Sequence, residues 1–254
     1  MYVLSTYKCS LVKIFALYWR IWRTYFAWAR ILLPLACVVF VPLGLVHAIP
    51  VHADATSLDL DNGLLGASAF LAFLLLVATG ILGEIFYTGA VAIALTRPHD
   101  GEPPTLLEVA RSIRYGRLIV VDLIFGVLVA LGSLAFVIPG VLVFVYLGLA
   151  APVVEIEHRG VRDALARSYR LVRGNFWLVF AVLVPIEVFS DAIGALATNL
   201  HPLLGDSLVA EWLADTATNI VLTPFYAVAA VLLTTDLIAA RDGIDPRLHS
   251  TPPA

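Results

Sequence analysis

Two acidic residues, Glu187 and Asp191, lie four positions apart in an apolar stretch spanning about 175–198. Residues at this spacing share one face of a helix, and carboxyl groups inside hydrocarbon are costly enough to be functional candidates. Such a pair could carry a proton, bind a cation or contact a polar substrate headgroup. The structural alternative is that Glu187 is protonated and hydrogen-bonded to Asn219 or Thr223, while Asp191 lies close to water.

Three further acids, Glu84, Asp122 and Asp236, fall near the expected inner ends of apolar segments, where many arginines are also concentrated. We therefore expect charge pairing that fixes basic helices to the rest of the protein. The basic residues that could form these pairs, or bind lipid phosphate instead, are Arg111, Arg114, Arg162, Arg167, Arg170 and Arg173.

The sequence gives little support for a catalytic or metal site. His47, His52 and His201 accompany acidic residues on the expected outer side, but their spacing matches no known ligand pattern. The sequence contains no nucleophile elbow, phosphate-binding glycine loop, paired-histidine zinc helix or haem motif. We expect no catalytic residues, no metal and no cofactor.

Composition identifies the environment that positions these side chains. The chain has 254 residues, of which 61% are hydrophobic and only 14% are charged, whereas soluble domains carry about 25% charge. Segments long enough to cross about 30 Å of hydrocarbon predict an all-α integral membrane protein with six transmembrane helices. We expect these near 31–49, 64–85, 118–138, 140–156, 175–198 and 217–239, with a tight turn at Pro139–Gly140.

The basic residues test this count independently. All 16 lysines and arginines fall before the first span, between spans two and three, between four and five, or after span six. Asp54, Asp59, Asp61, Asp206, Glu211 and Asp215 occupy the other connections. Because basic loops remain on the cytoplasmic side, we predict a multi-pass protein of the bacterial inner membrane with both termini cytoplasmic.

Basic amphipathic helices are expected before three pairs of spans, in segments 10–30, 105–115 and 161–173. Thr105 and Glu108 form a capping-box pattern, and "ARSIR" at 110–114 is similar to "ARSYR" at 166–170. We therefore predict one membrane domain at 1–242, built as three hairpins that each follow a basic helix. The possible units are 8–96, 104–157 and 160–242, with a flexible cytoplasmic tail at 243–254.

The stretch from Pro139 to Phe180 combines a Pro-Gly turn, an Ala-Pro followed by Glu, an Ala-Leu-x-Arg-Ser helix, and an Arg-Gly before an aromatic-rich span. The residues of this pattern are Pro139, Gly140, Ala151, Pro152, Glu157, Ala164, Leu165, Arg167, Ser168, Arg173, Gly174 and Trp177. The pattern resembles the glycerophosphoryl diester phosphodiesterase membrane-domain family. The resemblance implies a membrane protein without an assigned reaction, because the predicted spans leave no room in this sequence for the phosphodiesterase barrel.

These observations favour a non-catalytic membrane protein that associates with lipids, anionic ones in particular, or organises partner proteins. The main alternative is a transporter or permease for a small or lipid-like substrate, which would use Glu187 and Asp191. A membrane-embedded enzyme is a third hypothesis and rests on the family name alone. Nucleic-acid binding is not expected, because the basic helices adjoin the membrane and no separate reading domain is present. A water-filled cavity at Glu187 would favour transport.

Overall fold

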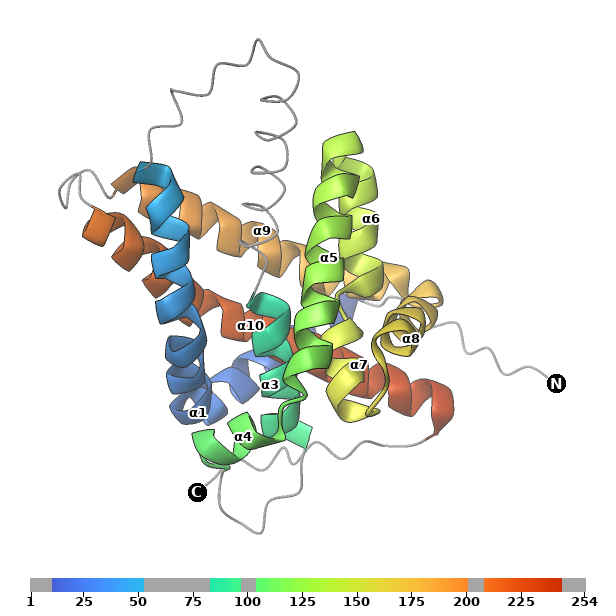
Figure 1. Cartoon of the computed structure of the whole chain (residues 1–254). Coiled ribbons are helices and arrows are strands. Elements are labelled where there is room, and N and C mark those ends of the chain that lie inside the picture. Colours follow the sequence, from blue (N-terminus) through green and yellow to red (C-terminus); the bar gives the residue numbers. More distant parts are fainter. Residues whose placement is uncertain (1–10, 53–82, 97–103, 201–207, 244–254) are drawn as a thin grey trace.

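The computed structural model describes residues 11–52, 83–96, 104–200 and 208–243, and every element in these ranges is a helix (Figure 1). The helices are α1 (Leu11–His52), α3 (Glu84–Thr96), α4 (Leu106–Ser112), α5 (Tyr115–Ala135), α6 (Val137–Leu147), α7 (Ala150–Ile156), α8 (Val161–Arg173), α9 (Phe176–Leu200) and α10 (Leu208–Asp242). The expected all-α class is confirmed for these residues.

Helix α10 lies at the centre of the bundle and packs against α1, α9 and α3. Its residues 226–233 are all buried, as expected for a helix that is apolar on every side. Helix α1 runs antiparallel to α10. Arg20 pairs with Asp236 at 2.9 Å, and the Tyr25 ring stacks on Phe225 with 4.0 Å between ring centroids.

Helix α3 is a core element that the sequence analysis did not predict. Residues 87–95 are all buried, although we expected a connection there after a span at 64–85. The helix follows Gly83, which adopts a left-handed φ of 105° that favours glycine. The Asp122 side chain accepts a hydrogen bond from the Gly83 amide at 2.9 Å. Residues 64–82 of the expected span lie outside the described residues.

Helices α5 and α6 form a hairpin and lie side by side (Figure 1). The chain reverses at Phe136, which is extended with a φ of −166°, so the turn predicted at Pro139–Gly140 is three residues too late. Pro139 lies in the first turn of α6, where a missing amide hydrogen costs little. Gly140 is needed for close approach, because a Cβ there would lie 2.9 Å from the Cα of Ser133.

The first predicted unit is also wrong in detail. A separate interfacial helix at 10–30 and a span at 31–49 were expected, but α1 is continuous from Leu11 to His52. The sequence from 11 to 33 contains no glycine or proline that would end a helix between these two parts.

The expected order of elements recurs in the second and third units. Helix α4 precedes α5 and α6, and α8 precedes α9 and α10. The predicted capping box of α4 is present, since the Thr105 side chain accepts from the Glu108 amide and Glu108 accepts from the Thr105 amide. The predicted span 140–156 divides into α6 and α7 at residues 148–149. The tail beyond residue 243 lies outside the described residues.

Candidate functional site

A polar cavity of about 290 Å³ lies among α3, α9 and α10. Three acidic residues line it: Glu84 comes from the start of α3, and Glu187 and Asp191 come from one face of α9. We call this space the acid cavity. Its neutral polar residues are Ser190, Thr218, Asn219, Thr223 and Tyr226. The cavity thus brings together hydroxyl, amide and carboxyl groups inside an otherwise apolar bundle.

The residues that line the acid cavity differ in exposure. Asp191 is exposed, Glu84 and Glu187 are partly buried, and Tyr226 is only 2% exposed. The Tyr226 hydroxyl has no hydrogen-bond partner, and it lies so close to Gly148 that a Cβ at residue 148 would be 2.9 Å from it. A buried hydroxyl without a partner is costly, so Tyr226 carries an unsatisfied polar group next to the cavity.

The charged side chains that line the acid cavity, among the described residues, are all acidic. Glu84, Glu187 and Asp191 line the same space, so any two of these carboxyl groups that are ionised repel each other. No lysine, arginine or histidine is among the described residues that line the cavity. Because charges interact more strongly in a low-dielectric interior than in water, a ligand carrying a positive charge would be attracted to this space.

The structure groups the predicted acids differently from the sequence analysis. Glu187 and Asp191 share one wall as their spacing indicated, and Asn219 and Thr223, their expected structural partners, line the same cavity. Glu84 was expected at an inner end beside arginines, and this is wrong because α3 begins inside the bundle.

The other two inner-end acids have partners outside this cavity. Asp236 pairs with Arg20 of α1, as expected for an acid that fixes a basic helix. Asp122 was expected to pair with an arginine, but it instead accepts a hydrogen bond from the amide of Gly83.

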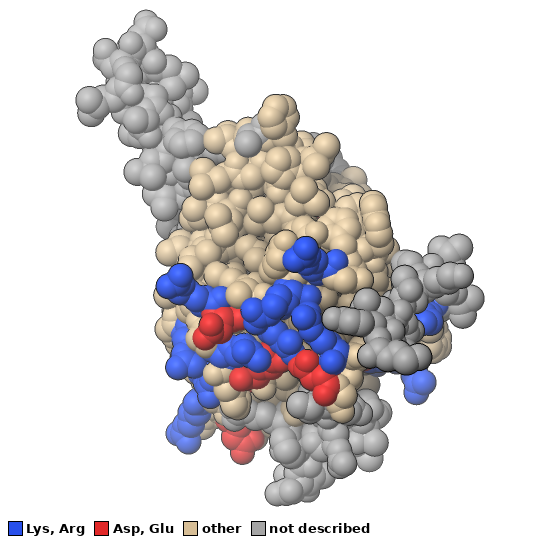
Figure 2. Space-filling view, turned by 90° about the vertical axis from the view of Figure 1, so that its right-hand side faces the viewer, with Lys and Arg blue, Asp and Glu red and all other residues tan. Residues whose placement is uncertain are grey.

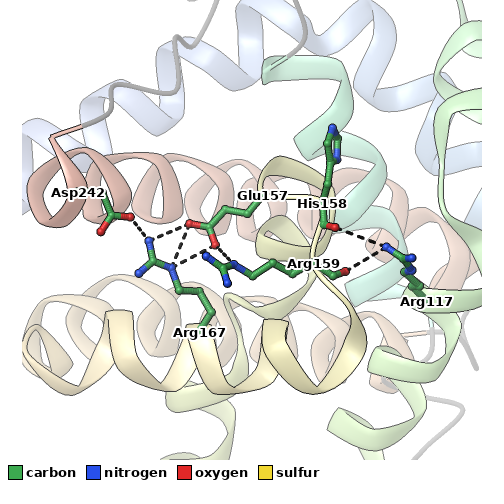
Figure 3. A network of polar contacts seen from close by, with 6 residues as sticks. All are labelled: Arg117, Glu157, His158, Arg159, Arg167 and Asp242. Atoms are coloured by element: carbon green, nitrogen blue, oxygen red, sulfur yellow. Dashed lines mark hydrogen bonds and ion pairs between the residues drawn. The ribbon is translucent and has the colours of Figure 1, made fainter.

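A second polar cluster joins the end of α7, the middle of α8 and the end of α10, and we call it the arginine corner (Figure 3). The Arg167 Nη2 atom lies 2.8 Å from Glu157 Oε1, and its Nε atom lies 3.0 Å from the same oxygen. Arg167 also pairs with Asp242, and Glu157 pairs with Arg159. Burial disfavours the charged guanidinium, but hydrogen bonds and attraction from Glu157 and Asp242 outweigh it and raise the pKa of Arg167.

Backbone contacts extend the arginine corner to α5. His158 adopts a left-handed φ of 57°, and the carbonyl oxygens of His158 and Arg159 both accept from Arg117 Nη1 at 3.5 Å. Glu155 accepts a hydrogen bond from the Arg114 amide at 3.1 Å. The connection between α7 and α8 is therefore held from several directions.

The predicted basic residues divide into two groups. Arg167 was placed on the polar face of its helix, yet it is 6% exposed and braces the bundle. Arg114 is partly buried, whereas Arg111, Arg162, Arg170 and Arg173 are exposed. The exposed group is available to solvent or lipid, and Arg167 is not.

The residues that carry the family resemblance have structural contacts here. Glu157 and Arg167 pair with each other, and the Ser168 hydroxyl donates to the Tyr146 carbonyl at 2.7 Å. Gly174 is the C-cap of α8 and Pro152 is buried in α7. Together with Pro139 and Gly140 of the α5–α6 hairpin, these positions build the joints between helices.

Within the described ranges, five helical stretches are long and apolar enough to cross a membrane, and Phe86–Thr96 is a shorter apolar helix. The chain is 32% identical over 97 residues to a UPF0259 membrane protein of Pectobacterium carotovorum. The chain is a multi-pass membrane protein. The matched stretch covers 37% of this chain and 39% of the relative's length. No protein-family model matches the chain, and no solved structure matches it.

Two features of the site were not predicted. Tyr226 was not a candidate, because a single tyrosine in an apolar run carries no signal until its neighbours are known. The position of Glu84 depends on where α3 begins, and glycines at 80 and 83 were the local signs of a break. Among the described residues, no group of histidine, cysteine and acidic side chains could hold a metal ion. His47, His52 and His201 lack described side chains.

Proposed function

We propose that this multi-pass protein lies in the bacterial cytoplasmic membrane, with its basic segments and both termini in the cytoplasm. The segregation of all 16 lysines and arginines into alternate connections supports this orientation. Figure 2 shows lysine and arginine gathered in a band below a surface without charged residues. Such a band beside an apolar surface fits the boundary between hydrocarbon and the cytoplasmic headgroups.

Cysteine accessibility tests this orientation. We would introduce His158→Cys into a variant in which Cys9 and Cys37 have both been replaced, because Cys37 is exposed and would react as well. In intact cells, a membrane-impermeant maleimide should leave residue 158 unlabelled, and it should label this residue after the membrane is opened. Labelling in intact cells would overturn the orientation and every role that depends on it.

We further propose a non-catalytic role in which the protein associates with anionic phospholipids. The observation that carries this proposal is the exposure of Arg111, Arg162, Arg170 and Arg173. Each basic residue near an anionic leaflet contributes about 1 kcal/mol. The resemblance to the glycerophosphoryl diester phosphodiesterase membrane-domain family is consistent with this role, because it concerns the membrane part alone.

A hollow of about 400 Å³ between α1, α9 and α10 gives this proposal a second support. Its walls are mainly leucine and alanine side chains, while Lys13, Arg20 and Asp236 contribute charges. The volume lies within the range of about 300–1,000 Å³ that is usual for ligand pockets. The apolar wall suits a phospholipid chain, with Lys13 and the Arg20–Asp236 pair beside it.

Native mass spectrometry can test lipid association. We expect the triple variant R162E/R170E/R173E to retain several-fold less phosphatidylglycerol than the wild type, with phosphatidylcholine little changed. The matched control R162K/R170K/R173K keeps the charge and should retain the lipid. Equal phosphatidylglycerol retention by the charge-reversed variant and the wild type would argue against the proposal.

A second candidate function, transport of a small or lipid-like substrate, is favoured by the acid cavity at Glu187. If the protein transports a substrate through this space, E187Q/D191N should abolish uptake into vesicles while the protein remains folded. Normal uptake by this variant would remove the main support for transport.

A further inference from the structure

The acid cavity adjoins an apolar hollow of about 380 Å³. Ser190 of α9 and Leu222 of α10 line both spaces. The remaining walls of the hollow come from α1, α9 and α10, and they include Tyr18, Trp22, Phe189 and Phe225. A molecule with one polar end and one apolar end could therefore occupy both spaces at once.

Charge determines which polar end fits. Three carboxyl groups surround the acid cavity, and none of its described lining residues is basic. An anionic group would be repelled, and a neutral group would leave the mutual repulsion of the acids unchanged. A positively charged group would reduce this repulsion, and close charge pairs of this kind are able to add to binding.

Tyr226 is an independent indication of a ligand. Tyr226 lines the acid cavity, and its buried hydroxyl, which lies beside Gly148, has no hydrogen-bond partner. Buried polar groups are normally satisfied by protein or by an ordered molecule. A bound ammonium group could donate a hydrogen bond to the hydroxyl oxygen, and the ring would provide an aromatic face for a cation.

The shape of the site argues against a simple metal ion. No group of three or more potential ligands among the described residues converges on one point, whereas Ca²⁺ and Mg²⁺ need about six or more oxygen ligands at close range. A bare proton would not need about 290 Å³ of space. A molecular cation uses both the charge and the volume.

We infer that the acid cavity and the adjoining hollow form one binding site for a small organic cation, with the ammonium group among the acids and an apolar portion in the hollow. Binding at this site goes beyond lipid association and does not depend on it. It also specifies the substrate class of the second candidate function and rests on the same cavity. The site is built from α1, α3, α9 and α10, which are distant in sequence.

Three related probes can test the two halves of the site by calorimetry on the purified, full-length protein in nanodiscs. Benzylammonium carries both a positive charge and an apolar ring. Benzyl alcohol lacks the charge, and methylammonium lacks the ring. We expect benzylammonium to bind at least about tenfold more tightly than either of the others. Empty nanodiscs measure the partitioning of each probe into lipid.

Variants then assign each half to its residues. Glu187→Gln should weaken benzylammonium binding about tenfold or more, whereas Asp163→Asn, an exposed acid on α8, should leave it unchanged. Phe189→Ala should reduce the preference for benzylammonium over methylammonium without weakening methylammonium. Tyr226→Phe should weaken benzylammonium binding several-fold and should not lower stability, because the hydroxyl has no hydrogen-bond partner in the structure.

Several results would overturn the inference. Equal binding of benzylammonium and benzyl alcohol would show that charge is not recognised, and equal effects of Glu187→Gln and Asp163→Asn would place the charge recognition elsewhere. If the protein binds Mg²⁺ and not benzylammonium, and this binding requires Glu187, the site belongs to a metal. If benzylammonium binds but is not moved across vesicle membranes, transport fails as a function while the binding site stands.

Discussion

The arginine corner and the acid cavity use the same kinds of charged group in opposite ways. In the arginine corner, Glu157 and Asp242 both contact the Arg167 guanidinium, so the buried charges have partners. In the acid cavity, Glu84 lies near Glu187 and Asp191, with no basic residue among the described lining residues. Since buried charges without partners destabilise a fold, the comparison separates charges that hold the protein together from charges available to a ligand.

The largest expected effect concerns Arg167. Arg167→Ala leaves Glu157 and Asp242 near each other without their shared cation, and we expect a loss of about 3 kcal/mol in the free energy of unfolding. Chemical denaturation in detergent micelles, followed by circular dichroism, measures it. Arg170→Ala on the same helix removes an exposed guanidinium and is the matched control. Equal stability of the two variants would mean that the arginine corner is not a brace.

Asp122 is intermediate between the paired acids of the arginine corner and the acids of the acid cavity, which have no ion-pair partner among the described residues. One of its carboxylate oxygens accepts from the Gly83 amide, while the other has no partner. Asp122→Ala should cost about 1–2 kcal/mol of stability, because the start of α3 loses its cap. Asp122→Asn retains an acceptor oxygen and should be close to wild type in the same denaturation experiment. If both variants lose equal stability, the negative charge matters more than the cap.

The exposed pair of Arg20 and Asp236 should contribute less. Their side chains are 47% and 44% exposed, and exposed ion pairs contribute less than about 1 kcal/mol. A double-mutant cycle with Arg20→Gln and Asp236→Asn isolates the interaction. A coupling free energy as large as the loss in Arg167→Ala would contradict our distinction between buried and exposed pairs.

The smallest expected change in stability comes from the acid cavity itself. The variant E187Q/D191N removes repulsion between acidic groups and breaks no ion pair identified in the structure. We expect the free energy of unfolding to stay within about 0.5 kcal/mol of wild type or to rise. A loss comparable to that of Arg167→Ala would show that these acids are structural, as the alternative interpretation of Glu187 proposed.

Sequence reasoning was most successful where a long-range physical rule applied. Hydropathy identified a helical membrane protein, and helical spacing placed Glu187 and Asp191 on one wall. It was less successful where local breaks decide the geometry. The φ of 105° at Gly83 begins α3 inside the bundle, and hydropathy does not register such a break. The position of Glu84 was wrong for this reason.

The burial of individual polar residues also could not be predicted from the sequence. The helical period assigned Arg167 to the polar face of α8, yet α7 and α10 each bring an acid to it. Nothing in the local sequence indicates that Asp242, 75 residues later, is its partner. The unpaired hydroxyl of Tyr226 is equally a property of packing, since it depends on the neighbouring Phe144 ring and on Gly148.

The pairing of α1 with α10 has a consequence for biosynthesis. A ribosome adds about 5–20 residues per second, so roughly ten seconds or more separate the emergence of Tyr25 from that of its stacking partner Phe225. During this interval the inward face of α1 has no final partner. Insertion machinery, surrounding lipid or a temporary helix contact must shield that face until the last helix is made.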